Sequence, residues 1–212
     1  MPVARCGHDV GVVNILEVML LVSTCEEEGV RAYHHGDLRC ALLVAAGELL
    51  DEGGAAAISL REVARRAGVS HNAPYRHFAD RDALLAALAA EGFAELSRRM
   101  ALLPASRLQA LGQCYVAFAL EQPGRFALMF GGVADKRRYP QLQQAAQALY
   151  RQLGASVQAV APGQDLATAS LAAWSLVHGL AQLLLDDQLP GQDAEAAAQA
   201  VTGLFVAGLG GA

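Results

Sequence analysis

The stretch at residues 58–78 most constrains the fold, because it carries the start and stop signals of two short helices joined by a tight turn. Ser59 is followed three residues later by Glu62, the spacing of a capping box at a helix N-terminus. Gly68 supplies the left-handed residue that ends a helix, and Ser70 is suited to cap a second one. The stretch therefore predicts a helix–turn–helix.

The second helix of this motif, about residues 71–78, is short and has little apolar surface. Pro74 falls in its first turn, where most N–H groups have no partner within the helix, so it removes at most one hydrogen bond. Its outward-facing polar residues are more numerous than core packing requires: His71, Asn72, Tyr75, Arg76 and His77. Such a helix suits the major groove of DNA, and the alternative is a helical corner with a solvated outer face.

Three segments resemble the DNA-binding domain of the tetracycline-repressor (TetR) family: Ser-Leu-Arg-Glu-Val-Ala-Arg-Arg-Ala-Gly-Val-Ser at 59–70, Tyr-Arg-His-Phe at 75–78 and Asp-Arg-Asp-Ala-Leu-Leu at 80–85. The resemblance covers about residues 33–93. The sequence departs from it at Asn72-Ala73-Pro74, where many members have Gly-Thr-Leu. The resemblance implies a DNA-binding regulator that docks in the family's way, with a base preference that cannot be transferred.

The candidate DNA contacts fall into two classes. His71, Asn72 and Arg76 are candidates for base edges, since Asn can read adenine and Arg guanine. The candidates for phosphate are Ser59, Arg61, Tyr75, His77 and Arg81, which would position the domain without reading sequence. In the resembled family a basic residue at the position of Arg81 commonly contacts phosphate. Ser70 and Ala73 complete the candidate set.

Charge is distributed unevenly along the chain. The net charge of −5 argues against a wholly basic nucleic-acid binder, yet residues 59–81 hold five arginines against two acidic residues. A basic patch on an acidic body is typical of a regulator with a separate domain that does not bind DNA. The four cysteines have neither metal-ligand nor disulfide spacing, which favours a reducing cytoplasm and no metal or other cofactor. A single lysine, Lys136, beside many arginines and alanines is typical of a GC-rich bacterial genome.

Residues 1–32 differ from the rest of the chain. The apolar run at 10–22 is too short to span a membrane. Glu17 within that run argues against a signal peptide or lipoprotein leader, the alternatives that Cys25 suggests. We interpret residues 1–32 as a disordered extension. His34 and His35, which follow it, either approach phosphate or are solvated.

The remaining sequence predicts an all-α fold, because alanine and leucine dominate its 54% apolar residues and recur at helical spacing. Proline and glycine pairs supply the breaks. The predicted helices lie at about 37–51, 81–101, 106–121, 123–131, 139–161, 165–186 and 191–209. We expect a three-helix DNA-binding domain at 33–95 and a C-terminal helical effector-binding and dimerisation domain at 96–212.

Trp174, His178 and Gly179 resemble the Trp-His-Gly signature of a C-terminal domain found in TetR-like regulators. Trp174 and His178 are four residues apart and share one helix face. His178 is either a hydrogen-bonded core residue or a polar anchor in an apolar pocket. The candidate effector-pocket residues, for each of which plain core packing is the alternative, are Tyr115, Phe118, Phe126, Met129, Trp174 and His178.

The last two predicted helices carry few charges on their outer faces. Val201, Leu204, Phe205 and Leu209 recur at helical spacing, and an isologous four-helix interface between two subunits would cover them. A dimer also reads two DNA half-sites. We therefore interpret the chain as a homodimeric repressor released from a palindromic operator by a small-molecule effector. The alternatives are an activator, or a helical ligand-binding protein or enzyme without DNA binding, although the sequence contains no supported catalytic constellation.

Overall fold

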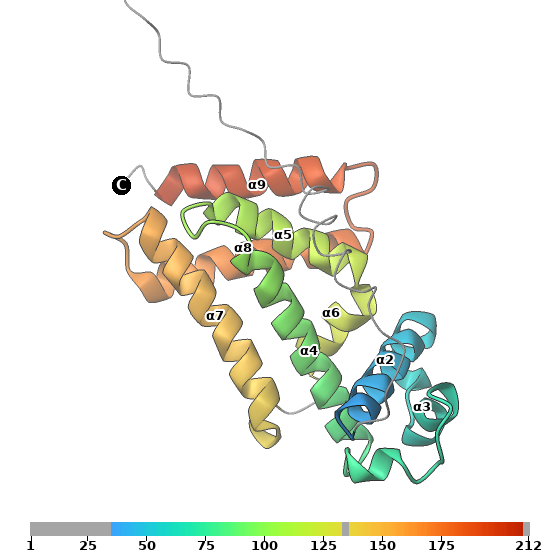
Figure 1. The fold of residues 1–212 in the computed structure, drawn as a ribbon. Helices are drawn as coiled ribbons and strands as arrows, with labels where there is room; N and C mark the ends of the chain where they lie inside the picture. The colour runs from blue at the N-terminus through green and yellow to red at the C-terminus, as the bar shows by residue number, and fades with distance from the viewer. Residues whose placement is uncertain (1–34, 133–135, 210–212) are drawn as a thin grey trace, which may run out of the picture.

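The computed structural model describes residues 35–132 and 136–209, and these residues form helices and turns without a β-strand (Figure 1). The α-helices are α2 (His35–Gly53), α3 (Leu60–Arg66), α4 (Arg81–Ala101), α5 (Leu108–Glu121), α6 (Pro123–Phe130), α7 (Pro140–Val160), α8 (Leu166–Leu185) and α9 (Ala194–Leu209). Three short 3₁₀ helices are η1 (Ala55–Ala57), η2 (Pro74–Arg76) and η3 (Lys136–Arg138). The all-α prediction is confirmed. The interpretations of residues 1–32 and His34 concern residues outside the described ranges, and so does any role of the His35 side chain.

Capping side chains set where α4, α8 and α9 begin. The Asp80 carboxylate accepts a hydrogen bond from the Ala83 N–H at 2.7 Å, and α4 begins at the next residue. Asp165 does the same for α8 through Thr168. Asp193 accepts from the Ala196 N–H at 2.8 Å, so α9 begins three residues later than predicted. Each carboxylate pairs an N–H that has no partner within its helix.

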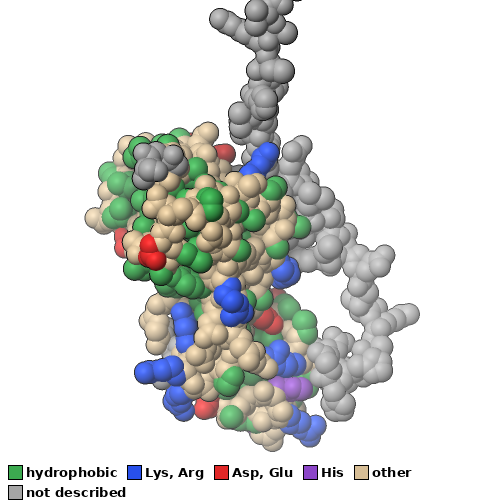
Figure 2. Space-filling view, turned by 90° about the vertical axis from the view of Figure 1, so that its left-hand side faces the viewer, with side chains coloured by type: hydrophobic (Ala, Val, Ile, Leu, Met, Phe, Trp, Pro, Cys, Tyr) green, Lys and Arg blue, Asp and Glu red, His purple; other side chains and the backbone are tan. Residues whose placement is uncertain are grey.

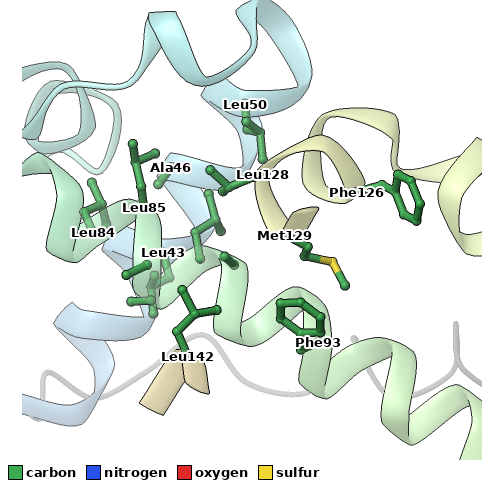
Figure 3. Packing of buried hydrophobic residues seen from close by; sticks show 14 of the residues in the cluster. Leu43, Ala46, Leu50, Leu84, Leu85, Phe93, Phe126, Leu128, Met129 and Leu142 are labelled. Atoms are coloured by element: carbon green, nitrogen blue, oxygen red, sulfur yellow. The ribbon is translucent and has the colours of Figure 1, made fainter. Parts of the chain in front are cut away.

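In the N-terminal unit, α2 packs against both α3 and α4. Its core is continuous with that of the rest of the molecule. Figure 3 shows Leu43, Ala46 and Leu50 of α2 in one buried cluster with Leu84 and Leu85 of α4, and the cluster extends to α6 and α7. The DNA-binding candidate residues and the C-terminal helices are therefore connected by packed side chains.

The C-terminal helices form the body of the molecule. In it, α4 packs against α7 and α6, and α5 packs against α8 and α9. Because α4 belongs both to the N-terminal unit and to this body, it joins the two (Figure 1). By length and composition α8 is apolar enough to cross a membrane, a test that core helices also pass. In the structure it packs against α5, α7 and α9.

The predicted outer face of the last helix is only partly correct. Leu204 is 78% exposed. Val201, Phe205 and Leu209 are half-buried and pack into small hydrophobic clusters. Helical spacing groups these four residues, but it does not reveal that α5 and α8 already cover three of them.

Candidate DNA-binding face and effector cavity

The first helix of the motif is capped as the sequence predicts. The Ser59 hydroxyl accepts a hydrogen bond from the Glu62 N–H at 3.1 Å. The carboxylate of Glu62 accepts from Arg65 rather than completing the capping box. Gly68 has φ 68°, and the Val69 N–H donates to the Ala64 carbonyl at 3.0 Å. This glycine ends α3 in the left-handed conformation that such a stop requires.

The second helix of the motif is shorter than predicted. It is the 3₁₀ turn η2, and its N-cap is Ala73, without a side-chain cap, rather than Ser70. Pro74 has no N–H to donate to the Ser70 carbonyl, which instead accepts from the Ala73 N–H at 2.9 Å. The turn at residues 71–73 is therefore not helical. Regular bonding resumes at the Ala73 carbonyl, which accepts from the Arg76 N–H at 3.2 Å, and continues at the Pro74 carbonyl, which accepts from His77 and Phe78.

This shorter segment still presents most of its polar side chains to solvent. His71, Asn72 and Arg76 are exposed, and the Tyr75 side chain is 57% exposed. Ala73 and His77 are half-buried. Buried Pro74 and Phe78 anchor the segment, and the Arg39 guanidinium of α2 lies 5.5 Å from the centre of the Phe78 ring. The remaining candidates Ser59, Arg61 and Ser70 are exposed.

Ion pairs divide the arginines of the basic patch into two groups. Arg66 donates to Glu52 at 2.6 Å and to Glu48 at 3.3 Å, so its charge ties α3 to α2. The hydrogen bond from Arg66 lowers the pKa of the Glu52 carboxyl below its usual value. Arg65 is likewise paired with Glu62. Within the described part of the chain, no ion pair involves Arg61 or Arg76, which leaves their charges for an external anion.

Arg81 has a role that the sequence did not reveal. Its Nε donates to the Ile58 carbonyl at 2.8 Å and its Nη2 donates to the Ala55 carbonyl at 2.5 Å. These bonds fix the chain before α3 to the start of α4. Nη1 lies 4.0 Å from Asp82.

A cavity of about 390 Å³ lies in the body, within the range of small-molecule sites. Side chains of α4, α5, α7, α8 and α9 line it, together with Phe130 at the end of α6 and Lys136 of η3. Gln143 and Gln147 of α7 line it and are exposed, so the cavity reaches solvent along that helix.

The predicted pocket residues separate into three groups. Tyr115 and Trp174 line the cavity. Phe118, Phe126 and Met129 are fully buried and are not among its lining residues. His178 is not a lining residue either, but it contacts one that is, Tyr115. A hydrophobic period marks the inward face of a helix without showing whether that face meets packed side chains or a cavity.

A hydrogen-bonded chain runs along one wall. The Trp174 Nε1–H donates to the Tyr115 oxygen at 3.4 Å, and that hydroxyl lies 2.9 Å from His178 Nδ1. We assign the hydroxyl as donor to Nδ1. Burial, and then the charge of Lys136, lower the pKa of His178, which favours the neutral ring that this assignment requires. Burial also raises the pKa of Tyr115.

Sequence reasoning missed Lys136 and the α7 glutamines as cavity residues. The single lysine of the chain was a signal, but its position depends on how the end of α6 and the start of α7 pack. Within residues 35–132 and 136–209, no cluster of three His, Cys, Asp or Glu side chains could hold a metal ion.

Two family models match the sequence. The model described as bacterial regulatory proteins, tetR family, matches residues 42–88, which contain α3 and the segment after it. The model described as a tetracyclin repressor-like C-terminal domain matches residues 108–205, which contain the cavity wall at Trp174 and Tyr115. No curated protein matches the chain.

Solved structures are similar over most of the chain. A protein of unknown function from Rhodococcus sp. RHA1 is 35% identical with a TM-score of 0.72, covering 84% of this chain and 98% of its own. The TetR family regulator PfmR from Thermus thermophilus is 20% identical (TM-score 0.58; 78% and 97% covered), a likeness of fold alone.

The regulator FadR from Bacillus subtilis, solved with stearoyl-CoA, is 17% identical (TM-score 0.64; 80% and 98% covered), again a likeness of fold. The two family models together account for both the helix–turn–helix and the body that holds the cavity. The chain belongs to the TetR family of DNA-binding transcriptional regulators.

Proposed function

We propose that this regulator is a homodimeric repressor that a small apolar or amphipathic effector releases from a palindromic operator. The observation that carries the proposal is the exposed polar segment at residues 71–76, held on a buried Pro74 and Phe78 anchor beside Arg61, whose charge is unmatched in the described part of the chain. Each segment would enter the major groove about 34 Å, one DNA turn, from its mate.

In this proposal residues 33–95 form the DNA-binding domain and residues 96–212 form the effector-binding and dimerisation domain. His71, Asn72 and Arg76 contact base edges, while Ser70 and Ala73 lie at the DNA surface. The phosphate contacts are Ser59, Arg61, Tyr75, His77 and Arg81. On the face seen in Figure 2, most Lys and Arg side chains lie in the lower half, the half that holds α2 and α3 in Figure 1, which supports a DNA-facing end.

The subunits would pair through the exposed sides of α8 and α9. Leu171 and Leu183 of α8 and Leu204 of α9 are exposed in the single chain, and the residues beside them are mostly small or apolar. Covering these leucines removes apolar surface from water, the main favourable term in association.

The effector would bind in the body cavity and act through α4. Phe93 and Met100 of α4 line the cavity, and Leu84 and Leu85 of the same helix pack in the DNA-binding unit. A ligand that fits only one orientation of α4 would shift the population of DNA-binding and non-binding dimers. FadR from Bacillus subtilis, with its stearoyl-CoA, is an example of a ligand-bound protein of this fold.

The deciding experiment is a gel-shift assay with duplex DNA flanking the protein's own gene, at low and raised ionic strength, against a scrambled duplex of equal length. We expect selective retention of the flanking DNA. Failure to retain it even at low salt would contradict the proposal and favour a helical ligand-binding protein. A reporter gene behind the same DNA distinguishes repressor from activator. We further propose a cytoplasmic protein without enzymatic activity.

A further inference from the structure

Lys136 is the one charged side chain among the described residues that line the cavity. It is the single lysine of the chain, it is half-buried, and its side chain lines the cavity. Its Nζ lies 4.9 Å from the ring centre of Phe93 and 5.4 Å from that of Phe130. Among the residues that the structure describes, no carboxylate pairs with it.

Among the described residues this half-buried ammonium has ring faces and no carboxylate beside it, so its charge is incompletely compensated there. Its contacts with the two phenylalanine rings are weak compared with a charge-assisted hydrogen bond. Burial accordingly lowers the pKa of Lys136. The positive charge also acts on its surroundings, since it contributes to the lowered pKa of His178. A bound anion would give this ammonium the counter-charge that residues 35–132 and 136–209 do not provide.

The rest of the cavity suits an uncharged, apolar body. The apolar lining residues include Leu108, Leu111, Ala173, Phe205 and Val206. Apart from Lys136, the polar lining groups are neutral: glutamine, tyrosine, serine and threonine side chains and the Trp174 indole. A ligand with two charged ends would leave one of them without a counter-charge among these lining residues. A cationic ligand would be repelled by Lys136.

We infer that the cavity takes an amphipathic anion, a molecule with one anionic head at Lys136 and an apolar body among the leucine and phenylalanine side chains. This inference rests on the proposed effector role of the cavity and adds to it the charge and shape of the ligand. The head can be a carboxylate or a phosphate monoester, since an ammonium group attracts and donates hydrogen bonds to both.

The test uses the intrinsic fluorescence of Trp174, because the chain has one tryptophan and it lines the cavity. The full chain is titrated with dodecanoate, dodecyl phosphate, dodecanol and dodecyltrimethylammonium, each below its micelle concentration. We expect saturable binding of at least one anion, at least about tenfold tighter than dodecanol, and no saturable binding of the ammonium compound. Comparing the two anions identifies the preferred head.

In Lys136→Gln, the dissociation constants for the preferred anion and for dodecanol should differ by no more than about threefold. Arg138→Gln is the matched control, since it removes one positive charge from an exposed position of η3 outside the cavity. It should keep the wild-type preference, as should Lys136→Arg. Circular dichroism verifies folding. Should Lys136→Gln fail to fold, the wild-type ranking and the Lys136→Arg variant still decide.

Equal affinity for dodecanol and both anions in the wild-type protein would overturn the inference, as would equal losses in Lys136→Gln and Arg138→Gln. A gel shift run in parallel separates this failure from that of the proposed function. DNA retention without anion preference overturns the inference alone. Anion binding that depends on Lys136 but leaves DNA retention unchanged supports the site and contradicts release by an effector.

Discussion

Arg61 and Arg65 lie about one helical turn apart on α3, but among the described residues only Arg65 has an ion-pair partner. Arg65 forms an ion pair with Glu62 at 2.5 Å, whereas Arg61 is exposed and has no ion pair within the described residues. We therefore expect Arg61→Ala to make the plot of log affinity against log salt shallower by about 0.9, one phosphate's share. Arg65→Ala is the control and should change the slope less. Equal changes in slope, measured by fluorescence anisotropy over a salt series, would contradict the assignment.

His178 makes a prediction about pH. Burial and the charge of Lys136 lower its pKa from 6.5, so the unfolded chain takes up this proton at a higher pH than the folded chain. The unfolded state then binds more protons below about pH 6.5, and the free energy of unfolding falls as the medium becomes more acidic.

The variant His178→Asn keeps an acceptor for the Tyr115 hydroxyl but does not titrate in this range. We expect the wild type to lose more stability than the variant between about pH 7.5 and about pH 5. Urea denaturation followed by Trp174 fluorescence at each pH measures both. A loss of equal size in the two proteins would show that His178 does not contribute.

At the scale of elements, the sequence contained most of the helix boundaries. The predicted and observed ends of α4 coincide at Arg81 and Ala101, because Asp80 is a strong cap and Pro104 follows soon after the end. The observed ends of α5 to α9 lie within three residues of the predicted ends. Caps and helix breakers act within about one turn of the chain, so the helix ends that they set can be predicted from a single sequence.

The features that the sequence did not predict depend on distant contacts. The sequence shows that Pro74 cannot donate a hydrogen bond to the Ser70 carbonyl, but not how much this one missing bond matters. Because few other hydrogen bonds hold so short a segment, the second motif helix is reduced to one 3₁₀ turn. Phe126 and Phe130 are both apolar and one turn apart in α6. Only the packing of α6 against α2, α4 and α5 decides that Phe130 lines the cavity and that Phe126 is fully buried.

Two glycines within helices make opposite predictions. A Cβ at Gly112 of α5 would lie 2.7 Å from Thr202 Cγ2 and 3.1 Å from Val177 Cγ1. Thr202 is buried and its hydroxyl donates to the Ala198 carbonyl, so it cannot easily turn away. A Cβ at Gly154 of α7 would meet only Ser170 Oγ, at 3.8 Å.

We therefore expect Gly112→Ala to destabilise the protein by about 1–2 kcal/mol, because overpacking outweighs the gain in helix propensity. Gly154→Ala should stabilise it by about 0.5–1 kcal/mol, since there the gain is not opposed. Chemical denaturation of both variants measures the difference. If Gly112→Ala also stabilised the protein, the approach of α5 to α9 would be looser than these distances indicate. If Gly154→Ala destabilised it, the space beside Gly154 would be smaller than 3.8 Å indicates.

For the whole molecule, the decisive property is the continuity of its core. Side chains of α2, α4, α6 and α7 belong to one buried cluster, so the DNA-binding unit is not connected to the body by a flexible linker (Figure 3). In the proposed release, a change at the cavity would tilt this unit rather than deform it, because packed side chains are close to crystal density and compress little. Tilting changes DNA affinity only if two units are held together, which makes the dimer a requirement of the proposed release.

Leu204 provides the test of that requirement. It is 78% exposed on α9, and Leu102, just after α4, is a comparable leucine at 59% exposure that belongs to neither α8 nor α9. Leu204→Glu would place a carboxylate in an apolar interface of two subunits, where burying the charge is costly. We expect this variant to be monomeric by light scattering and to lose operator affinity, while Leu102→Glu stays dimeric and binds DNA normally. If Leu204→Glu remained a dimer with unchanged DNA binding, α9 would not form the interface, and release could not act through the pairing proposed for α8 and α9.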